Sequence, residues 1–206
     1  MSVTQEKNRV QDPRVAFFDH HAATWDDDAQ EVAQTLARLE SLRGRLGLRP
    51  GQDVLEAGCG TGRITGWLVQ VVHPGRVVGV DFSPAMLARA TARGLAAEFR
   101  LLDICAEATV REAFDVVFCF HAFPHFRDPL RALRSIHGLL KPGGELIVLH
   151  LIGSRELNAF HARQSDPVCH DRLPGPEAWM GMLANAGWRL LSLADEPDLF
   201  LLRAAA

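Results

Sequence analysis

Short apolar runs alternate with longer stretches of helical pattern along most of this chain. The runs are rich in Val, Ile, Leu and Phe, and several are apolar at consecutive positions. Strands that are buried on both faces have this pattern. Strands that alternate with helices form a parallel sheet covered by helices on both faces. We therefore predict a doubly wound α/β fold, with strands at residues 53–58, 76–82, 97–103, 114–120, 144–152, 188–196 and 198–204.

Three predicted helices have clear boundaries. An apolar stripe at helical spacing, from Val32 to Leu46, precedes the first strand. Ser83-Pro84 opens a second helix. A third begins at Asp128-Pro129, with Pro in the first turn, and we expect it to end at Lys141-Pro142-Gly143-Gly144.

Charge and cysteine content narrow the partners and the compartment. The formal net charge of -3 argues against a phosphate-tracking partner, because such binding needs a basic face. The four cysteines lack the spacing of a disulfide framework or a structural zinc site, and free thiols indicate a reducing compartment. No apolar run approaches the roughly 20 residues that span a bilayer. We expect a cytoplasmic monomer or homodimer, with no nucleic acid or membrane partner.

A glycine-rich turn follows the first predicted strand. Gly58, Gly60 and Gly62 stand between that strand and a helix. Such a turn lets a ligand approach the backbone and the helix N-terminus closely. Asp81 ends the second strand, where a carboxylate can bind both hydroxyls of a ribose. The segment predicts a site for a nucleoside-containing ligand.

Two ligands compete for this turn. The dinucleotide fingerprint is G-x-G-x-x-G, but its last position is Arg63 here and the third glycine comes one residue early. Glu56 stands two residues before Gly58. A carboxylate there would repel a pyrophosphate, but it suits a ligand with an ammonium and a sulfonium group. The residues thus favour S-adenosylmethionine over a nicotinamide dinucleotide.

A family resemblance rests on three segments that occur in order: VLEAGCGTG, VVGVDFSPAML and FDVVFCFHAFPHFRDPLRALRSIHGLLKPGGELIVLH. Over about residues 50–150 the chain resembles the class I S-adenosylmethionine-dependent methyltransferases, and most of all the group that includes the ubiquinone and menaquinone biosynthetic enzymes. The resemblance implies a Rossmann-like, mostly parallel seven-stranded sheet with an N-terminal helical cap. It implies a single domain over residues 1–206: the cap at 1–50, a cofactor-binding half at 51–152, and a substrate-side insertion with the last two strands at 153–206.

The resemblance also implies cofactor roles for matching positions. The glycine turn and Glu56 would surround the methionine part, Asp81 would bind the ribose, and Phe82 and Met86 would flank the adenine. Asp103 could instead cap the following short helix. The full set of expected cofactor-binding residues is Glu56, Gly58, Gly60, Gly62, Asp81, Phe82, Met86, Asp103, Ile104, Cys119 and Phe120.

Catalysis would depend on the acceptor. Methyl transfer from a sulfonium needs a general base only when the acceptor atom carries a proton of high pKa. Since the chain has no Tyr, histidines are the candidate bases. We predict His121, after the fourth strand, and His150, at the end of the fifth, as catalytic residues. Either could instead make only a polar contact at a strand end.

In related enzymes the N-terminal helices and the segment after the fifth strand close over the cofactor. The resemblance therefore predicts a substrate pocket formed by Phe18, Trp25, His125, Arg155 and His161.

The segment at 161–175 raises a metal hypothesis. His161, Cys169 and His170, with Asp166 or Asp171, could bind a soft metal. Their spacing matches no zinc motif. We therefore predict a lid loop with polar residues and no metal site.

The predicted function is methyl transfer from S-adenosylmethionine to a small-molecule acceptor by in-line displacement. The N/D-P-P-Y/F motif of nucleic-acid amino methyltransferases is missing after the fourth strand. Two alternatives stay open. One is a non-catalytic S-adenosylmethionine-binding or partner subunit, and the other is an NAD-dependent oxidoreductase, which Arg63 and Glu56 oppose.

Overall fold

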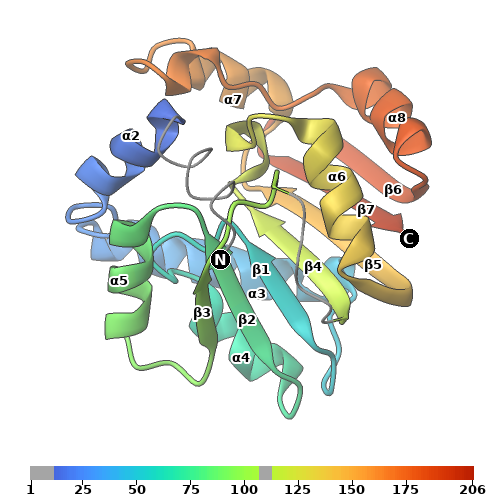
Figure 1. The fold of residues 1–206 in the computed structure, drawn as a ribbon, viewed down its shortest axis with the longest axis horizontal. Helices are drawn as coiled ribbons and strands as arrows, with labels where there is room; N and C mark the ends of the chain where they lie inside the picture. Colours follow the sequence, from blue (N-terminus) through green and yellow to red (C-terminus); the bar gives the residue numbers. More distant parts are fainter. Residues whose placement is uncertain (1–11, 107–112) are drawn as a thin grey trace.

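A computed structural model describes residues 12–106 and 113–206 of the chain. Within these residues, seven strands form one sheet in the order β3-β2-β1-β4-β5-β7-β6 (Figure 1). The strands from β3 to β5 pair in parallel, whereas β7 runs antiparallel to both β5 and β6. The sheet is therefore mixed. The strand bounds are β1 Val54–Ala57, β2 Val77–Asp81, β3 Glu98–Leu101, β4 Phe114–Phe120, β5 Leu140–His150, β6 Arg189–Glu196 and β7 Leu199–Ala205.

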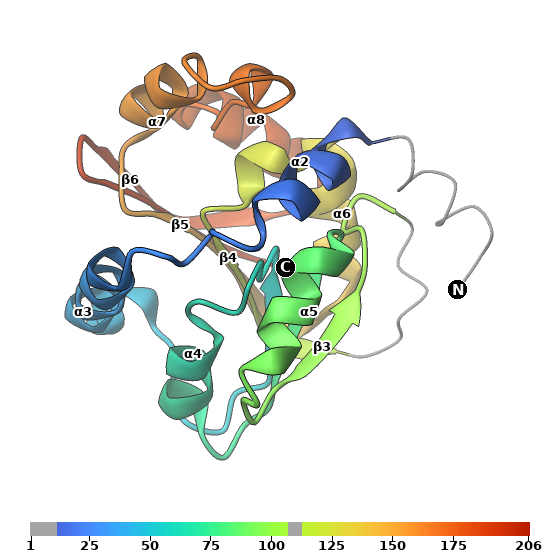
Figure 2. The same cartoon turned by 90° about the vertical axis from the view of Figure 1, so that its left-hand side faces the viewer.

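Helices pack on the sheet through two separate apolar clusters. Val54 of β1 lies in a cluster with α3 and α4, while its neighbour Leu55 lies in a cluster with α6 and α8. Because successive strand residues point to opposite faces, these helix pairs lie on opposite sides of the sheet (Figure 2). The helix bounds are α2 Pro13–His21, α3 Ala29–Leu46, α4 Thr65–Val72, α5 Pro84–Ala92, α6 Pro129–Gly138, α7 Ser154–His161 and α8 Pro176–Asn185, with 3-10 turns η1 Phe123–His125 and η2 Val168–His170.

The strands occur where the apolar runs predict them, but one helix end was predicted wrongly. Helix α6 ends at Gly138, before the Lys-Pro-Gly-Gly sequence that we expected to terminate it. Leu140 already belongs to β5, where it pairs with Phe114, and the register shifts before Val116 pairs with Glu145. Glycine is a poor helix former, and Leu140 gains a partner in the ladder, so the chain leaves the helix early.

The N-terminal helix α2 is attached to the start of α5. Asp19 accepts hydrogen bonds from the Ser83 hydroxyl, at 2.5 Å, and from the backbone N–H of Ala85, at 3.1 Å. Phe18 and Met86 are buried together in a small apolar cluster. These contacts hold α2 beside the carboxyl end of β2. No helix within the described residues is long and apolar enough to cross a membrane.

Candidate cofactor and acceptor site

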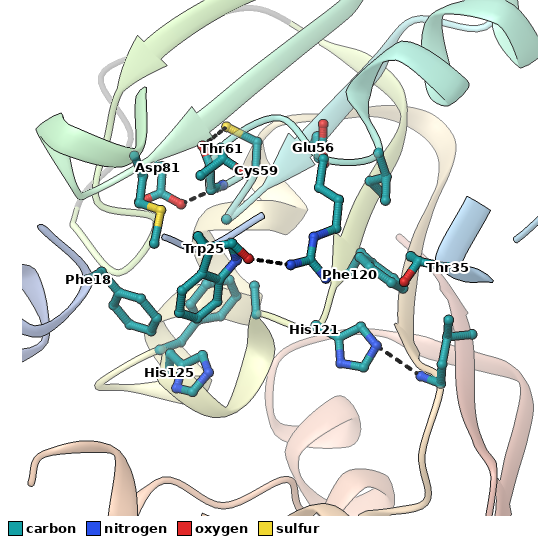
Figure 3. A pocket seen from close by; sticks show the side chains of 18 of the residues that line it. Phe18, Trp25, Thr35, Glu56, Cys59, Thr61, Asp81, Phe120, His121 and His125 are labelled. Carbon is teal, nitrogen blue, oxygen red and sulfur yellow. Dashed lines mark hydrogen bonds between the residues drawn. The ribbon is translucent and has the colours of Figure 1, made fainter. Parts of the chain in front are cut away.

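A cavity of about 540 Å³ opens at the carboxyl ends of β1 and β4. These two strands are neighbours, and the chain continues from them toward opposite edges of the sheet. Ligands bind at such a switch point in doubly wound sheets, and the volume is typical of a small-molecule site. Figure 3 shows the residues around it. The lining is Phe18, Trp25, Glu31, Thr35, Glu56, Gly58, Cys59, Gly60, Thr61, Arg63, Ile64, Asp81, Phe82, Met86, Phe120, His121, Ala122, His125, Phe126, Leu151, Leu157, Phe160 and His161.

The glycine turn forms one wall of the cavity, and two of its glycines are required by geometry. Gly58 has a φ of 74°, and a Cβ there would lie 2.4 Å from the Cβ of Ala122. Gly60 also has a positive φ, of 54°, but the space where its Cβ would stand is open. Gly58 therefore allows the turn to pack against the β4 loop. Gly60 leaves room for a ligand beside the backbone.

Glu56 at the carboxyl end of β1 is a buried carboxyl group in the cavity lining. Its Oε2 accepts a hydrogen bond of 2.6 Å from the Thr65 hydroxyl. Burial raises the pKa of Glu56 to about 8, the nearby Asp81 carboxylate raises it further, and the Thr65 bond only partly opposes this. Without a cationic partner, this group is therefore largely protonated at neutral pH. A ligand ammonium beside Glu56 would supply the missing charge.

Asp81 joins the glycine turn to the start of α5. Its Oδ2 accepts from the backbone N–H of Gly60, at 2.9 Å, and its Oδ1 accepts from that of Ser83, at 2.8 Å. Burial raises the pKa of Asp81, although these backbone donors lower it in part. Both oxygens retain lone pairs, and the residue lines the cavity. This carboxylate can accept from two ribose hydroxyls.

Hydrogen bonds join the loop between α2 and α3 to the glycine turn. Asp26 accepts hydrogen bonds from the Thr61 hydroxyl, at 2.5 Å, and from Arg63, at 2.7 Å. Arg93 also donates to Asp26, at 2.5 Å. Arg63 donates further to the backbone oxygen of Trp25, at 2.6 Å. Sequence reasoning missed these hydrogen bonds.

The two predicted catalytic histidines occupy different environments. His121 lines the cavity with a φ of 53°, and its Nε2 accepts from the backbone N–H of Leu151, at 3.1 Å. Burial lowers the pKa of His121 to about 3. His150 is fully buried, lies outside the cavity lining, and its ring nitrogens have no partner among the described residues. Burial lowers its pKa as well.

His125, which was predicted as a substrate-pocket residue, belongs to a polar network that sequence reasoning missed. His125 lines the cavity, and its Nδ1 lies 2.6 Å from Oδ2 of Asp171. Arg14 of α2 donates through Nε to Oδ1 of the same carboxylate, at 2.9 Å, and again through its terminal nitrogen. Burial opposes ionisation of Asp171, but the bonds from His125 and Arg14 hold its pKa below the ordinary value.

The structure thus divides the predicted site residues into two groups. Those in the cavity lining are Phe18, Trp25, Glu56, Gly58, Gly60, Asp81, Phe82, Met86, Phe120, His121, His125 and His161. Those outside it are Gly62, Asp103, Ile104, Cys119, His150 and Arg155. Asp103 accepts from the backbone N–H of Cys105 and pairs with Arg127, and Arg155 is exposed and pairs with Glu156. Cys119 is buried in the sheet.

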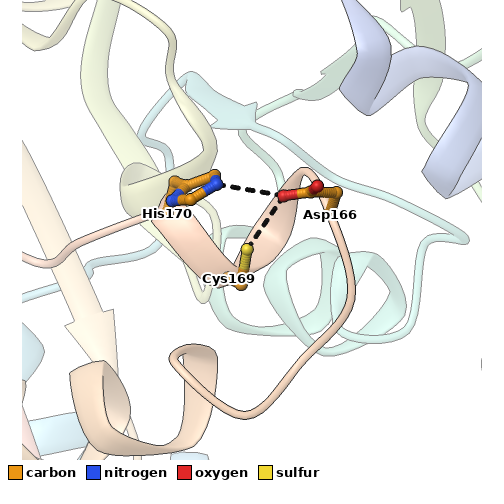
Figure 4. Close-up of side chains that lie close together, drawn as sticks. All are labelled: Asp166, Cys169 and His170. Carbon is orange, nitrogen blue, oxygen red and sulfur yellow. Dashed lines mark hydrogen bonds and ion pairs between the residues drawn. The ribbon is translucent and has the colours of Figure 1, made fainter.

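The side chains of the metal hypothesis are also separated. His161 is buried, and its Nδ1 lies 3.1 Å from the backbone oxygen of Asp171. Asp166, Cys169 and His170 form a cluster at the surface (Figure 4). The Cys169 thiol and Nε2 of His170 each lie 3.0 Å from Oδ1 of Asp166. This carboxylate raises the pKa of the Cys169 thiol.

Comparison with known proteins gives methyltransferases among the relatives of this chain. The family model for a methyltransferase domain matches residues 55–148. A demethylmenaquinone methyltransferase of Thermus thermophilus is 31% identical over 161 residues, which cover 66% of this chain and 73% of that protein. A ubiquinone biosynthesis O-methyltransferase of Pseudomonas paraeruginosa is 33% identical over 153 residues, 68% of this chain and 63% of that protein.

Other curated relatives are longer. Phosphoethanolamine N-methyltransferase 1 of Zea mays is 30% identical over 165 residues, which cover 76% of this chain but 32% of that protein. The chain therefore spans about a third of the length of this relative and of a similar one from Triticum aestivum.

Solved structures share the fold. A methyltransferase in complex with the Trm112 activator of Haloferax volcanii matches with a TM-score of 0.77 at 21% identity, over 92% of this chain and 97% of that one. The complex of DhpI with SAH matches with a TM-score of 0.72 at 24% identity, over 92% and 93% of the two chains. The family-model match and the Thermus relative show that the chain belongs to the class I S-adenosylmethionine-dependent methyltransferases and that its cofactor is S-adenosylmethionine.

Proposed function

We propose that the chain transfers a methyl group from S-adenosylmethionine to a small-molecule acceptor by in-line displacement. One observation carries the proposal: a single cavity is lined both by buried carboxyl groups and by apolar and aromatic side chains. Asp81 and Glu56 lie beside the open glycine turn, and we place the cofactor end there. Leu157 and Phe160 of α7 are apolar members of the same lining, and we place the acceptor end against them.

The first end suits the cofactor. Glu56 would receive the ammonium group and Asp81 the ribose hydroxyls, while Phe82 and Met86 would contact the adenine. When bound there, S-adenosylmethionine supplies a methyl group that its sulfonium has already activated. The contribution of the chain is alignment, which is worth up to roughly 7–11 kcal/mol in well-oriented reactions.

The second end suits an apolar acceptor. Among the described lining residues Arg63 is the only Arg or Lys, and its guanidinium already donates to Asp26, Glu31 and Trp25. The described lining thus offers no unpaired Arg or Lys for an acceptor phosphate. The names of the relatives include both a phosphoethanolamine enzyme and quinone enzymes. The lining favours an acceptor of the second, more apolar kind.

Closure over this acceptor would come from two segments. We assign residues 12–50, the described part of the N-terminal cap, and the insertion after β5 to the acceptor side of one domain; residues 1–11 of the predicted cap lie outside the described residues. Phe18 and Trp25 come from the first segment, and Leu157, Phe160 and His161 from the second. The ion pair between Arg14 and Asp171 joins the two segments.

Two experiments test the proposal. Thermal unfolding is followed with S-adenosylmethionine, S-adenosylhomocysteine and NAD in parallel. A ligand at about 100 times its Kd stabilises by about 2.7 kcal/mol, which raises the Tm by roughly 5–10 °C in a chain of this size. We expect both adenosyl ligands, but not NAD, to give this shift. A response to NAD only would overturn the proposal in favour of an oxidoreductase.

Release of S-adenosylhomocysteine is then measured with a panel of phenols, thiols, amines, acidic carbons and metalloids. We expect at least one class to be methylated. Adenosyl binding without turnover on any class would instead favour a non-catalytic binding subunit.

A further inference from the structure

We infer that His125, oriented by Asp171, is the general base that removes the proton from an aromatic hydroxyl acceptor in this cavity. The inference rests on the proposed function, and it adds a catalytic residue, a positioning residue and an acceptor class to it. Three observations carry it: the contact between the two side chains, the position of His125 in the lining, and the aromatic side chains that share this lining.

The contact between the two side chains sets the tautomer of His125. Asp171 has a fully buried side chain and is kept ionised by Arg14 and His125, so its oxygens can only accept hydrogen bonds. Nδ1 of His125, 2.6 Å from Oδ2, must therefore carry a proton and donate it. In the neutral form of the ring, Nε2 is then the unprotonated nitrogen, and it has no hydrogen-bond partner among the described residues. The ring is thus ready to accept a proton at Nε2.

Packing holds the ring in this orientation. The ring lies edge-on to Phe18 of α2, with centroids 5.0 Å apart, and 5.2 Å from the ring of His161. Phe18 also contacts Phe82 and Trp25. His125 therefore lies among the aromatic side chains of the lining, and Figure 3 shows it near Phe18 and Trp25.

The other histidines of the lining are less suited to this task. His121 already uses Nε2 to accept from Leu151, and burial has lowered its pKa to about 3. His161 has a backbone carbonyl behind its Nδ1 instead of a carboxylate, and burial lowers its pKa as well. Of these three rings, only that of His125 has a side-chain carboxylate that can stabilise the imidazolium formed after proton transfer.

The acceptor class follows from what a base is needed for. A phenolic hydroxyl has a pKa near 10, and a thiol ionises more readily, near 8.5 for cysteine. At neutral pH a phenol gains most from a base, while a thiol partly supplies its own thiolate. In the step that we infer, the acceptor oxygen forms a bond to the methyl carbon as the carbon–sulfur bond breaks. The hydroxyl proton passes to Nε2 of His125, and S-adenosylhomocysteine leaves with the electron pair of the broken bond.

The test compares matched acceptors that differ in the reacting atom. Wild type, His125→Gln and Asp171→Asn are assayed for S-adenosylhomocysteine release with phenol, catechol and 2-naphthol, and with thiophenol and 2-naphthalenethiol. His73→Gln, an exposed histidine beyond the end of α4, is the matched control. Binding of S-adenosylhomocysteine is measured by calorimetry for every variant, so that loss of the folded site is detected separately.

Asp171→Asn tests orientation while keeping the shape of the side chain. Arg14 donates to Oδ1, so the amide oxygen of Asn is held there and the amide NH₂ is turned toward His125. Nδ1 must then accept, and the proton moves to Nε2, where it blocks the base. This change alters catalysis without removing a contact from the lining.

We expect His125→Gln to lower kcat on the hydroxyl acceptors by about 10²–10⁴-fold and Asp171→Asn by at least about tenfold. Both should keep S-adenosylhomocysteine affinity and rates on the two thiols within about threefold of wild type and His73→Gln. Equal losses on hydroxyls and thiols, or an unchanged hydroxyl rate in His125→Gln, would overturn the inference and leave the proposed function intact. Turnover of thiols but not hydroxyls by wild type would overturn the acceptor class. No turnover by wild type on any of these five acceptors would overturn the inference, and the wider acceptor panel would decide the proposed function separately.

Discussion

Binding of S-adenosylhomocysteine should release a proton from Glu56. The carboxyl group is buried, its pKa is raised to about 8, and Thr65 is its only hydrogen-bond partner among the described residues. If the ligand ammonium pairs with the ionised form, binding below pH 8 must first remove the proton. Each pH unit below 8 then costs about 1.4 kcal/mol, a factor of ten in Kd. Binding should therefore tighten about tenfold between pH 6 and pH 7.

Isothermal titration calorimetry measures both quantities. Titrations at pH 6 and 7 in buffers of different ionisation enthalpy give the Kd and the number of protons released. This range stays below the α-amino pKa of about 8, so the ligand keeps its ammonium. We expect close to one proton per ligand at pH 6. In Glu56→Gln the release and the pH dependence should vanish, while Glu177→Gln, an exposed residue of α8, should behave like wild type. A wild-type Kd that is equal at the two pH values, with no proton released, would refute the reasoning.

The same raised pKa predicts how the ligand-free protein responds to pH. A carboxyl group whose folded pKa lies above its unfolded value stabilises the protein fully below the unfolded pKa, here about 4.5. That contribution is lost as the pH rises through about 8. Relative to Glu56→Gln, the Tm of wild type should therefore fall between pH 6 and pH 8.5. An unchanged difference in Tm over this range would contradict the assignment.

Four further predictions concern single positions. Asp81→Ala should abolish the thermal shift with S-adenosylhomocysteine, because the ribose loses its acceptor; a preserved shift would contradict the ribose assignment. Gly58→Ala should destabilise the protein by about 1–3 kcal/mol in urea unfolding, since a Cβ meets Ala122 at 2.4 Å and the φ is positive. Asp26→Ala removes the acceptor of the Thr61 hydroxyl and one of the three acceptors of Arg63, and we expect a loss of about 1–3 kcal/mol by the same measurement. After incubation with excess zinc and desalting, metal analysis should find less than one zinc ion per several chains. One zinc ion per chain that is lost in Cys169→Ser would instead support the metal hypothesis.

The parts of the fold that could be predicted are those with local signals. The strands are continuous apolar runs, because parallel strands are buried on both faces. The glycine turn and Asp81 were recognised because their spacing follows from one strand–turn–helix–strand unit. The end of α6 was missed, because the pairing of Leu140 with Phe114 is a long-range contact that competes with helix continuation.

The acceptor side of the site depends on contacts between distant segments. Asp171 lies 46 residues from His125 and 157 from Arg14, and nothing in its neighbourhood marks it as their partner. Asp26 meets Arg63 across 37 residues for the same reason. The strand-end position of His150 predicted that its ring faces the cavity. In the structure, packing around the end of β5 buries the ring outside the cavity lining. Side-chain direction at a strand end is set by tertiary packing, which the local pattern does not encode.

Transfer of a labelled methyl group tests the central claim most directly. The protein is incubated with S-adenosylmethionine carrying a trideuterated methyl group and with the acceptor that releases most S-adenosylhomocysteine, and the products are analysed by mass spectrometry. We predict an acceptor heavier by one trideuterated methyl in place of a hydrogen, in equimolar amount with S-adenosylhomocysteine, and no product from Asp81→Ala. Binding of S-adenosylmethionine with no labelled acceptor formed, or product formation that is equal in Asp81→Ala, would contradict the account.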